Sequence, residues 1–146
     1  MSIIGIIAAF GGGGLGAFMG ALPIFILTGF FAIAGGILGI AGVADVSVGN
    51  ITFGTLLGPH IGFAGGVAAL AYACNRKKSY ENGCNILMPL ACTNDFSVII
   101  VGGIFGALGY ILAHLFGNVL SIPSDIPGLT VTVLAVITRL VFGKCG

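Results

Sequence analysis

The sequence contains very few charged residues, and this scarcity limits the class of protein that it encodes. Of 146 residues, five are lysine or arginine and four are aspartate or glutamate, which is 6% of the chain, whereas a soluble domain contains about 25%. A soluble protein could not cover its surface with so few charges, which argues strongly against a water-soluble enzyme. The formal net charge of +1 provides no concentrated basic face, so we expect no nucleic-acid partner.

Motifs that carry catalysis or metal binding are also missing. The sequence has no phosphate-binding loop, no Gly-x-Ser-x-Gly motif and no paired acid and base within an apolar run. We therefore predict no enzyme activity, no cofactor and no bound metal. Two alternatives stay open: a metal held by His60 and His114, and a redox or metal-binding role for the cysteines, although their irregular spacing includes no Cys-x-x-Cys pair. The four cysteines are Cys74, Cys84, Cys92 and Cys145.

Long apolar runs account for most of the chain. Hydrophobic residues make up 58% of it and the mean hydropathy is +1.20, and a helix needs about 20 apolar residues to cross a bilayer. The uncharged run 2–43 fits two such helices, with Pro23 at their turn because proline disfavours a helical conformation in the preceding residue. We predict an all-α integral membrane protein, a compact bundle of about five transmembrane helices in a single domain, 1–146. The expected helices are 2–21, 24–43, 51–74, 96–117 and 129–143.

The basic residues predict an orientation for these helices. Three of them, 76–78, follow the third predicted helix, and Arg139 and Lys144 lie at the end of the fifth. With five spans these two ends face the same side, which the positive-inside rule makes cytoplasmic. The hydrophilic loop 75–95 and the C-terminus are then cytoplasmic, and the N-terminus is outside. The expected location is the plasma membrane of a bacterium or an archaeon.

Glycine is the most over-represented residue type, with 27 in the chain. Many glycines recur at a spacing of four, and residues four apart share a helix face. Such ladders allow helices to pack backbone against backbone in lipid. We expect the bundle to pack through Gly-xxx-Gly contacts, some of them with another subunit. The residues assigned to helix packing are Gly12, Gly16, Gly20, Gly35, Gly39, Gly54, Gly66, Gly102 and Gly106.

The segment Gly58-Pro59-His60 is expected to break the third predicted helix. Proline removes a backbone donor and clashes with the preceding turn, and the freed backbone groups must find partners within the membrane. Two half-helices, about 51–57 and 61–74, would then present carbonyls and amides to an ion or small polar solute. The histidine would place an ionisable ring near the bilayer centre, where such groups are costly and usually functional. The alternative is a proline-kinked helix with a neutral histidine bonded across the bundle. The predicted solute pathway consists of Gly58, Pro59, His60 and Gly62.

A short internal similarity relates residues 12–17 to residues 102–107, at an offset of 90. Inverted repeats of this kind occur in transporters, which bind their solutes at the repeat interface. A chance match in a sequence rich in glycine, alanine and leucine is the favoured explanation, because a complete second copy would need a sixth helix.

These features favour a small oligomeric membrane channel or transporter for an ion or small polar solute. Five helices with short loops form a thin wall, so we expect the lipid bilayer and either a homo-oligomer or a partner membrane chain as partners. The alternative function is a non-transporting membrane subunit that anchors or stabilises a larger complex, with the glycine ladders as its interface.

Overall fold

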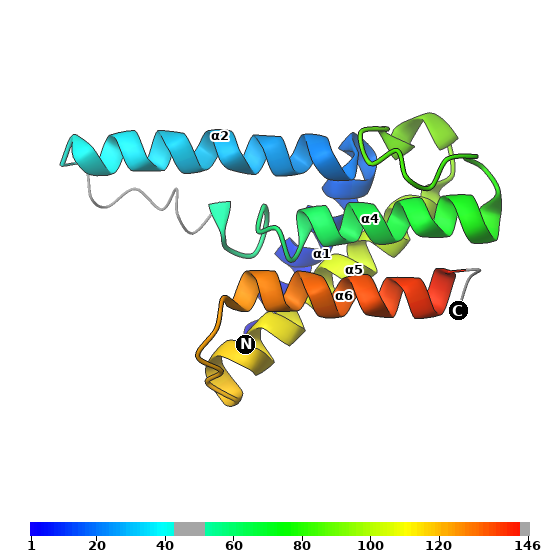
Figure 1. Cartoon of the computed structure of the whole chain (residues 1–146). Helices are drawn as coiled ribbons and strands as arrows, with labels where there is room; N and C mark the ends of the chain where they lie inside the picture. Colours follow the sequence, from blue (N-terminus) through cyan, green and yellow to red (C-terminus); the bar gives the residue numbers. More distant parts are fainter. Residues whose placement is uncertain (43–51, 144–146) are drawn as a thin grey trace.

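The computed structural model describes residues 1–42 and 52–143. Within these residues the chain contains five α-helices and no β-strand. Figure 1 shows α2, α4 and α6 with their axes roughly parallel, the chain running in α2 opposite to its direction in α4 and α6, and α1 and α5 crossing behind them and in contact with α4. The helices are α1 (Ile3–Met19), α2 (Ala21–Ile40), α4 (Gly62–Tyr72), α5 (Phe96–His114) and α6 (Ile126–Phe142).

Short helical segments extend two of these helices and precede a third. A π-helix, Ala73–Lys77, continues α4, another, Leu115–Val119, continues α5, and a 3₁₀ helix, Leu90–Thr93, comes before α5. In the described part of the chain, α2 and the continuous stretch Phe96–Val119 are long and apolar enough to cross a membrane, on length and composition alone. The helices α1 and α6 are apolar but shorter, at 17 residues each. The all-helical prediction is confirmed, and the membrane bundle stays a prediction.

The sequence predicted the turn between the first two helices at Pro23, but in the structure the turn lies at Gly20. Gly20 has a φ of +100°, and a Cβ there would lie 2.9 Å from the carbonyl oxygens of both Leu87 and Met88. Pro23 instead occupies the first turn of α2, where its missing N–H leaves no helical hydrogen bond unmade. Gly20 is therefore a turn residue between two helices and not part of a packing ladder, which corrects its predicted role.

Within the third predicted helix, 51–74, Thr52 is helical, but the helix α4 begins only at Gly62. Residues 53–61 form turns and bends, so the expected first half-helix is wrong over this segment. The physical reason is Pro59, which cannot donate a backbone hydrogen bond and disfavours a helical conformation in the residue before it. Gly54 consequently lies in a bend and not on a helical ladder.

Other boundaries differ from the predictions by a few residues. The helix α6 begins at Ile126, earlier than predicted, because Pro127 lies at its first turn, a position that proline favours. Several predicted features fall outside the described residues: residue 43, residue 51, Lys144 and Cys145.

Glycines bring the backbones of α1, α4 and α5 into direct contact. A Cβ on Gly65 would lie 2.6 Å from the carbonyl oxygen of Gly102 and 2.7 Å from the Cα of Gly13. A Cβ on Gly13 would in turn overlap the same carbonyl oxygen of Gly102, so the three helices cross where none has a side chain. Besides Gly20, five of the predicted packing glycines lie at close backbone contacts with another segment: Gly12, Gly16, Gly66, Gly102 and Gly106.

The outer half of α2 projects beyond the rest of the bundle (Figure 1). Phe30 and Ile33 are 66% and 62% exposed there, and a Cβ on Gly36 or Gly39 would meet no atom within 4 Å. Gly39 of the predicted ladder therefore has no described segment against it. The reason is length, because α2 has 20 residues and α4, against which it packs, has 11.

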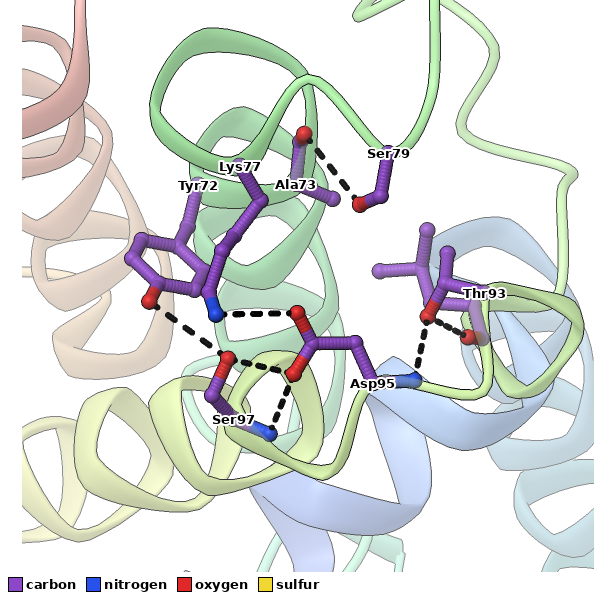
Figure 2. A network of polar contacts seen from close by, with 8 residues as sticks. Tyr72, Ala73, Lys77, Ser79, Thr93, Asp95 and Ser97 are labelled. Atoms are coloured by element: carbon purple, nitrogen blue, oxygen red, sulfur yellow. Dashed lines mark hydrogen bonds and ion pairs between the residues drawn. The ribbon is translucent and has the colours of Figure 1, made fainter.

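The hydrophilic loop 75–95 is attached to the ends of α1, α4 and α5. Leu90 is 2% exposed and packs in a cluster with residues of all three helices. Figure 2 shows the polar side of this attachment, where Lys77 Nζ lies 3.1 Å from a carboxylate oxygen of Asp95. Ser97 donates to the other oxygen of Asp95 from its hydroxyl at 2.6 Å and from its backbone amide at 2.9 Å.

Candidate functional site

Three backbone carbonyls of the turn at residues 53–61 accept hydrogen bonds from other groups of the chain. The carbonyl of Gly58 accepts two amide hydrogen bonds from the start of α4, at 2.8 and 2.9 Å, and that of Pro59 accepts one at 3.1 Å. The carbonyl of Leu57 accepts from the hydroxyl of Thr28 on α2 at 2.8 Å. The carbonyls near the proline break therefore have partners within the chain, which satisfies them in an apolar setting. The expected row of free carbonyls is not formed by these three residues, so side chains have to provide any solute site.

His60 is the buried polar side chain of this turn. The residue is 5% exposed, and Nδ1 of its imidazole is buried without a hydrogen-bond partner. A Cβ on Gly58 would lie 2.6 Å from Cε1 of the ring, and a Cβ on Gly109 of α5 would overlap the carbonyl oxygen of His60. Two glycines thus create the space that His60 occupies. An unsatisfied buried polar atom costs about 1–3 kcal/mol, which makes His60 the first candidate for a functional residue.

His60 lies on the wall of a pocket of about 300 Å³, which we call the histidine pocket. Its wall is built from the turn at residues 53–61, the second half of α5 with its π-helical extension, and the start of α6. The polar side chains on it are imidazole, hydroxyl and amide groups, with no carboxylate among them. The pocket is lined by Phe53, Gly54, Thr55, His60, Tyr110, Ala113, His114, Asn118, Ile126 and Pro127.

His114 has contacts at both ring nitrogens. Nδ1 lies 2.7 Å from the side-chain amide of Asn118, one turn further along the chain. Nε2 lies 3.2 Å from the backbone nitrogen of Met1. One turn earlier, the hydroxyl of Tyr110 accepts a hydrogen bond from the backbone amide of Ser2 at 3.4 Å. These contacts orient the α5 side chains of the pocket and connect them to the start of α1.

A larger pocket of about 550 Å³ shares Phe53 and Pro127 with the histidine pocket, and we call it the aromatic pocket. Its walls come from α2, the turn at residues 53–61, α4, α6 and the loop between α4 and α5. The rings of Phe25 and Phe63 have their centroids 5.6 Å apart at an interplanar angle of 57°. The pocket is lined by Leu22, Phe25, Phe53, Pro59, Phe63, Ile86, Asp125, Pro127, Gly128 and Val131.

The four residues predicted to form a solute pathway have different positions. His60 lines the histidine pocket, Pro59 lines the aromatic pocket, and Gly58 lies against the His60 ring. Gly62 is not on the wall of either pocket. Its carbonyl is the backbone group that Gly16 of α1 approaches, so Gly62 packs helices, and its place in a solute pathway stays a prediction.

Metal ligands do not gather in the described residues. Within 1–42 and 52–143, no three histidine, cysteine, aspartate or glutamate side chains form a group that could hold a metal ion. His60 and His114 share a pocket, but both ring nitrogens of His114 already have partners. The described cysteines are free thiols: Cys74, Cys84 and Cys92.

The sequence matches the model of a family of unknown function, DUF7973, over residues 1–145. The chain belongs to this family. No curated protein and no solved structure matches it. Because the match spans all five helices, both pockets lie within the region that defines the family.

Sequence reasoning missed several residues of these pockets, although two signals were present. Tyr110, His114 and Asn118 recur at a spacing of four, which predicts one polar stripe on an otherwise apolar helix. Gly109 continues the face of the predicted ladder at Gly106, one helical turn further on. Asp125 carried no such signal, because it reaches the aromatic pocket only through the packing of α6 against α4.

Proposed function

We propose that this protein is an integral membrane channel or transporter for an ion or a small polar solute. The observation that supports this proposal is the histidine pocket, where a buried imidazole with an unpaired Nδ1 meets a polar stripe of α5. Buried ionisable groups in apolar helical proteins commonly mark solute or proton pathways. In this mechanism, Pro59 breaks the third span and His60 contacts the solute.

The outer surface of the bundle supports placement in a bilayer. Large apolar side chains are exposed along the helices, including Ile4 at 80%, Ile40 at 90% and Leu140 at 77%. Soluble monomers rarely expose extended apolar surface of this kind. In our proposal the five helices cross the membrane as a compact bundle packed through glycines, with the turn at residues 53–61 and α4 together forming the third span.

We propose a homo-oligomer, or an assembly with a partner membrane chain, as the working unit. The turn at residues 53–61, α5 and the start of α6 enclose a pocket of about 300 Å³, which is too small a wall for a complete pathway. Further copies or another chain would complete the wall on the side where the outer half of α2 exposes apolar side chains among the described residues.

Flux through reconstituted proteoliposomes tests the proposed function. Protons, monovalent cations, small anions and neutral solutes would be compared for the wild type, His60→Ala and His60→Gln. The wild type should conduct at least one class. His60→Ala should change its flux, and His60→Gln should preserve hydrogen bonding while abolishing any pH dependence that comes from the imidazole.

Phe96→Ala is the control variant, because Phe96 is exposed at the opposite end of α5 and lines neither pocket. Its flux should equal that of the wild type. Flux that is unaffected in a well-folded His60→Ala protein would contradict the assignment of His60. Absence of wild-type flux for all four classes of solute would favour the alternative function, a non-transporting subunit.

The alternative, a non-transporting subunit of a larger complex, is supported by the outer half of α2. Its apolar side chains are exposed, and a Cβ on Gly36 or Gly39 would meet no atom of the described residues within 4 Å. This function predicts that mild detergent extracts the protein together with a second membrane chain, and that the isolated chain unfolds more easily than the assembly.

A further inference from the structure

The aromatic pocket has a composition that the proposed solute pathway does not explain. At about 550 Å³ it is larger than the histidine pocket, and its volume lies in the range of small-molecule sites. Phe25, Phe53 and Phe63 contribute aromatic rings to its wall, and among the described residues Asp125 is the one charged residue on that wall. An apolar hollow with a single carboxylate is typical of a site for an amphipathic ligand.

The carboxylate of Asp125 forms no hydrogen bond or ion pair within the described residues. It stands at the N-cap of α6 but makes no capping hydrogen bond, and the one ion pair found in that part of the chain joins Lys77 to Asp95. Gly128 allows the carboxylate to lie close to the helix, because a Cβ there would overlap its Oδ2. Asp125 is therefore available to a ligand.

The charges around this carboxylate favour a cation. The described lysines and arginines lie in the loop after α4 or in the last turn of α6, at the opposite end of the bundle. The titratable group that interacts with Asp125 is His60, on the wall of the adjoining pocket. Apart from His60, no basic side chain of the described residues competes for the Asp125 carboxylate.

We infer that the aromatic pocket binds an amphipathic organic cation, with its ammonium group at Asp125 and its apolar part against Phe25 and Phe63. The carboxylate accepts a charge-assisted hydrogen bond from the ammonium, and the aromatic rings remove the apolar part of the ligand from water. An inorganic divalent cation is disfavoured because it requires several oxygen ligands and this wall supplies one carboxylate. Binding of such a cation does not depend on transport.

Binding of phenethylammonium to the purified full-length protein tests this inference, with 2-phenylethanol as the neutral analogue of similar size. Isothermal titration calorimetry at neutral pH would compare the two ligands. Phenethylammonium should bind the wild type more tightly than the alcohol. Asp125→Asn should weaken ammonium binding by about tenfold, because a charge-assisted hydrogen bond contributes on the order of that factor.

Three further variants separate recognition from loss of fold. Asp125→Glu retains the charge and should retain binding, Phe25→Leu should weaken binding of both ligands, and Glu81→Gln, an exposed acid in the loop at the other end, should bind as the wild type does. Equal affinity for the ammonium and the alcohol, or equal affinity in Asp125→Asn, would overturn the inference. Absence of phenethylammonium binding to the wild type would also overturn it.

The outcomes for this pocket and for the proposed function can be told apart. Ammonium binding that depends on Asp125, in a protein without flux, contradicts transport and leaves this inference standing. Flux that changes in His60→Ala, in a protein that does not bind phenethylammonium, supports transport and contradicts this inference.

Discussion

At the scale of single residues, glycine acts here by leaving space for another backbone. Gly13 lies against the carbonyl oxygen of Gly102 and the Cα of Gly106. Neither neighbour is a flexible side chain, so an added methyl group could be accommodated only by moving a helix. Gly36 on α2 differs completely, because a Cβ there would meet no atom within 4 Å.

This contrast predicts opposite effects for two chemically identical substitutions. Gly13→Ala should destabilise the protein by about 1–3 kcal/mol, the usual cost of overpacking a close contact. Gly36→Ala should be neutral or slightly stabilising, because alanine is the better helix former. Denaturant-induced loss of helical circular dichroism in detergent micelles measures both. Equal stability of the two variants would show that the crossing of α1 and α5 is not as tight as described.

At the scale of elements, Asp95 connects the start of α5 to the end of α4 (Figure 2). It is the N-cap of α5 and accepts from the Ser97 amide, while its other oxygen faces Lys77. Hydrogen bonds from Ser97 and then from Lys77 hold the pKa of the Asp95 carboxyl below its ordinary value of 3.8. The hydrogen bond to Asp95 raises the pKa of Lys77 above its ordinary value of 10.5.

These shifts predict how stability depends on pH at this end of the bundle. Because the Asp95 pKa is lowered on folding, its contribution is complete above the ordinary value and is lost as the pH falls through the folded-state value. The Lys77 contribution is complete below its ordinary value and is lost as the pH rises through its raised one. Both contributions are therefore present at neutral pH.

Asp95→Asn isolates the charge, since asparagine is an equally good N-cap. The variant should show a smaller loss of stability than the wild type as the pH falls from about 6 to 3, and only a small change at neutral pH, because the ion pair is exposed. Thermal unfolding across that pH range provides the measurement. If the variant lost as much thermal stability as the wild type on acidification, carboxylates other than Asp95 would control acid unfolding.

At the scale of the whole molecule, successive helices alternate in direction, which places chemically different groups at the two ends. Arg76 at the end of α4 donates to the carbonyl of Val141 near the end of α6, so the basic residues of both helices lie together. The start of α1 instead meets the second half of α5, where Ser2 bonds to Tyr110. The basic end and the histidine end are therefore opposite each other.

The orientation that we propose predicts which end reacts with a membrane-impermeant maleimide in intact cells. A variant that retains only Cys84, an exposed residue of the loop 75–95, should react only after the cells are permeabilised. A cysteine-free variant carrying Ser124→Cys, at an exposed position between α5 and α6, should react without permeabilisation. The reverse pattern would invert the orientation, and labelling of both in intact cells would contradict the positive-inside assignment.

Much of the helical architecture was predictable from local sequence. The apolar runs predicted where most helices lie, and Pro59 predicted the break in the third one because a missing N–H acts locally. The site was predicted in part: His60 was singled out by its position beside that proline. Its pocket partners were not, because Tyr110 and Asn118 line the same pocket as His60 only through the packing of α5 against the turn that precedes α4.

The sequence by itself determined the all-helical class, the interruption at Pro59 and the presence of glycine faces, since composition and spacing act within one helix. The tertiary structure alone decided which glycines are used. Gly12 and Gly39 both belong to predicted ladders, yet one meets a neighbouring segment and the other meets no atom within 4 Å. It also decided that Asp125 would line an aromatic pocket. These outcomes depend on how helices distant in sequence cross, and no spacing within a single helix encodes that crossing.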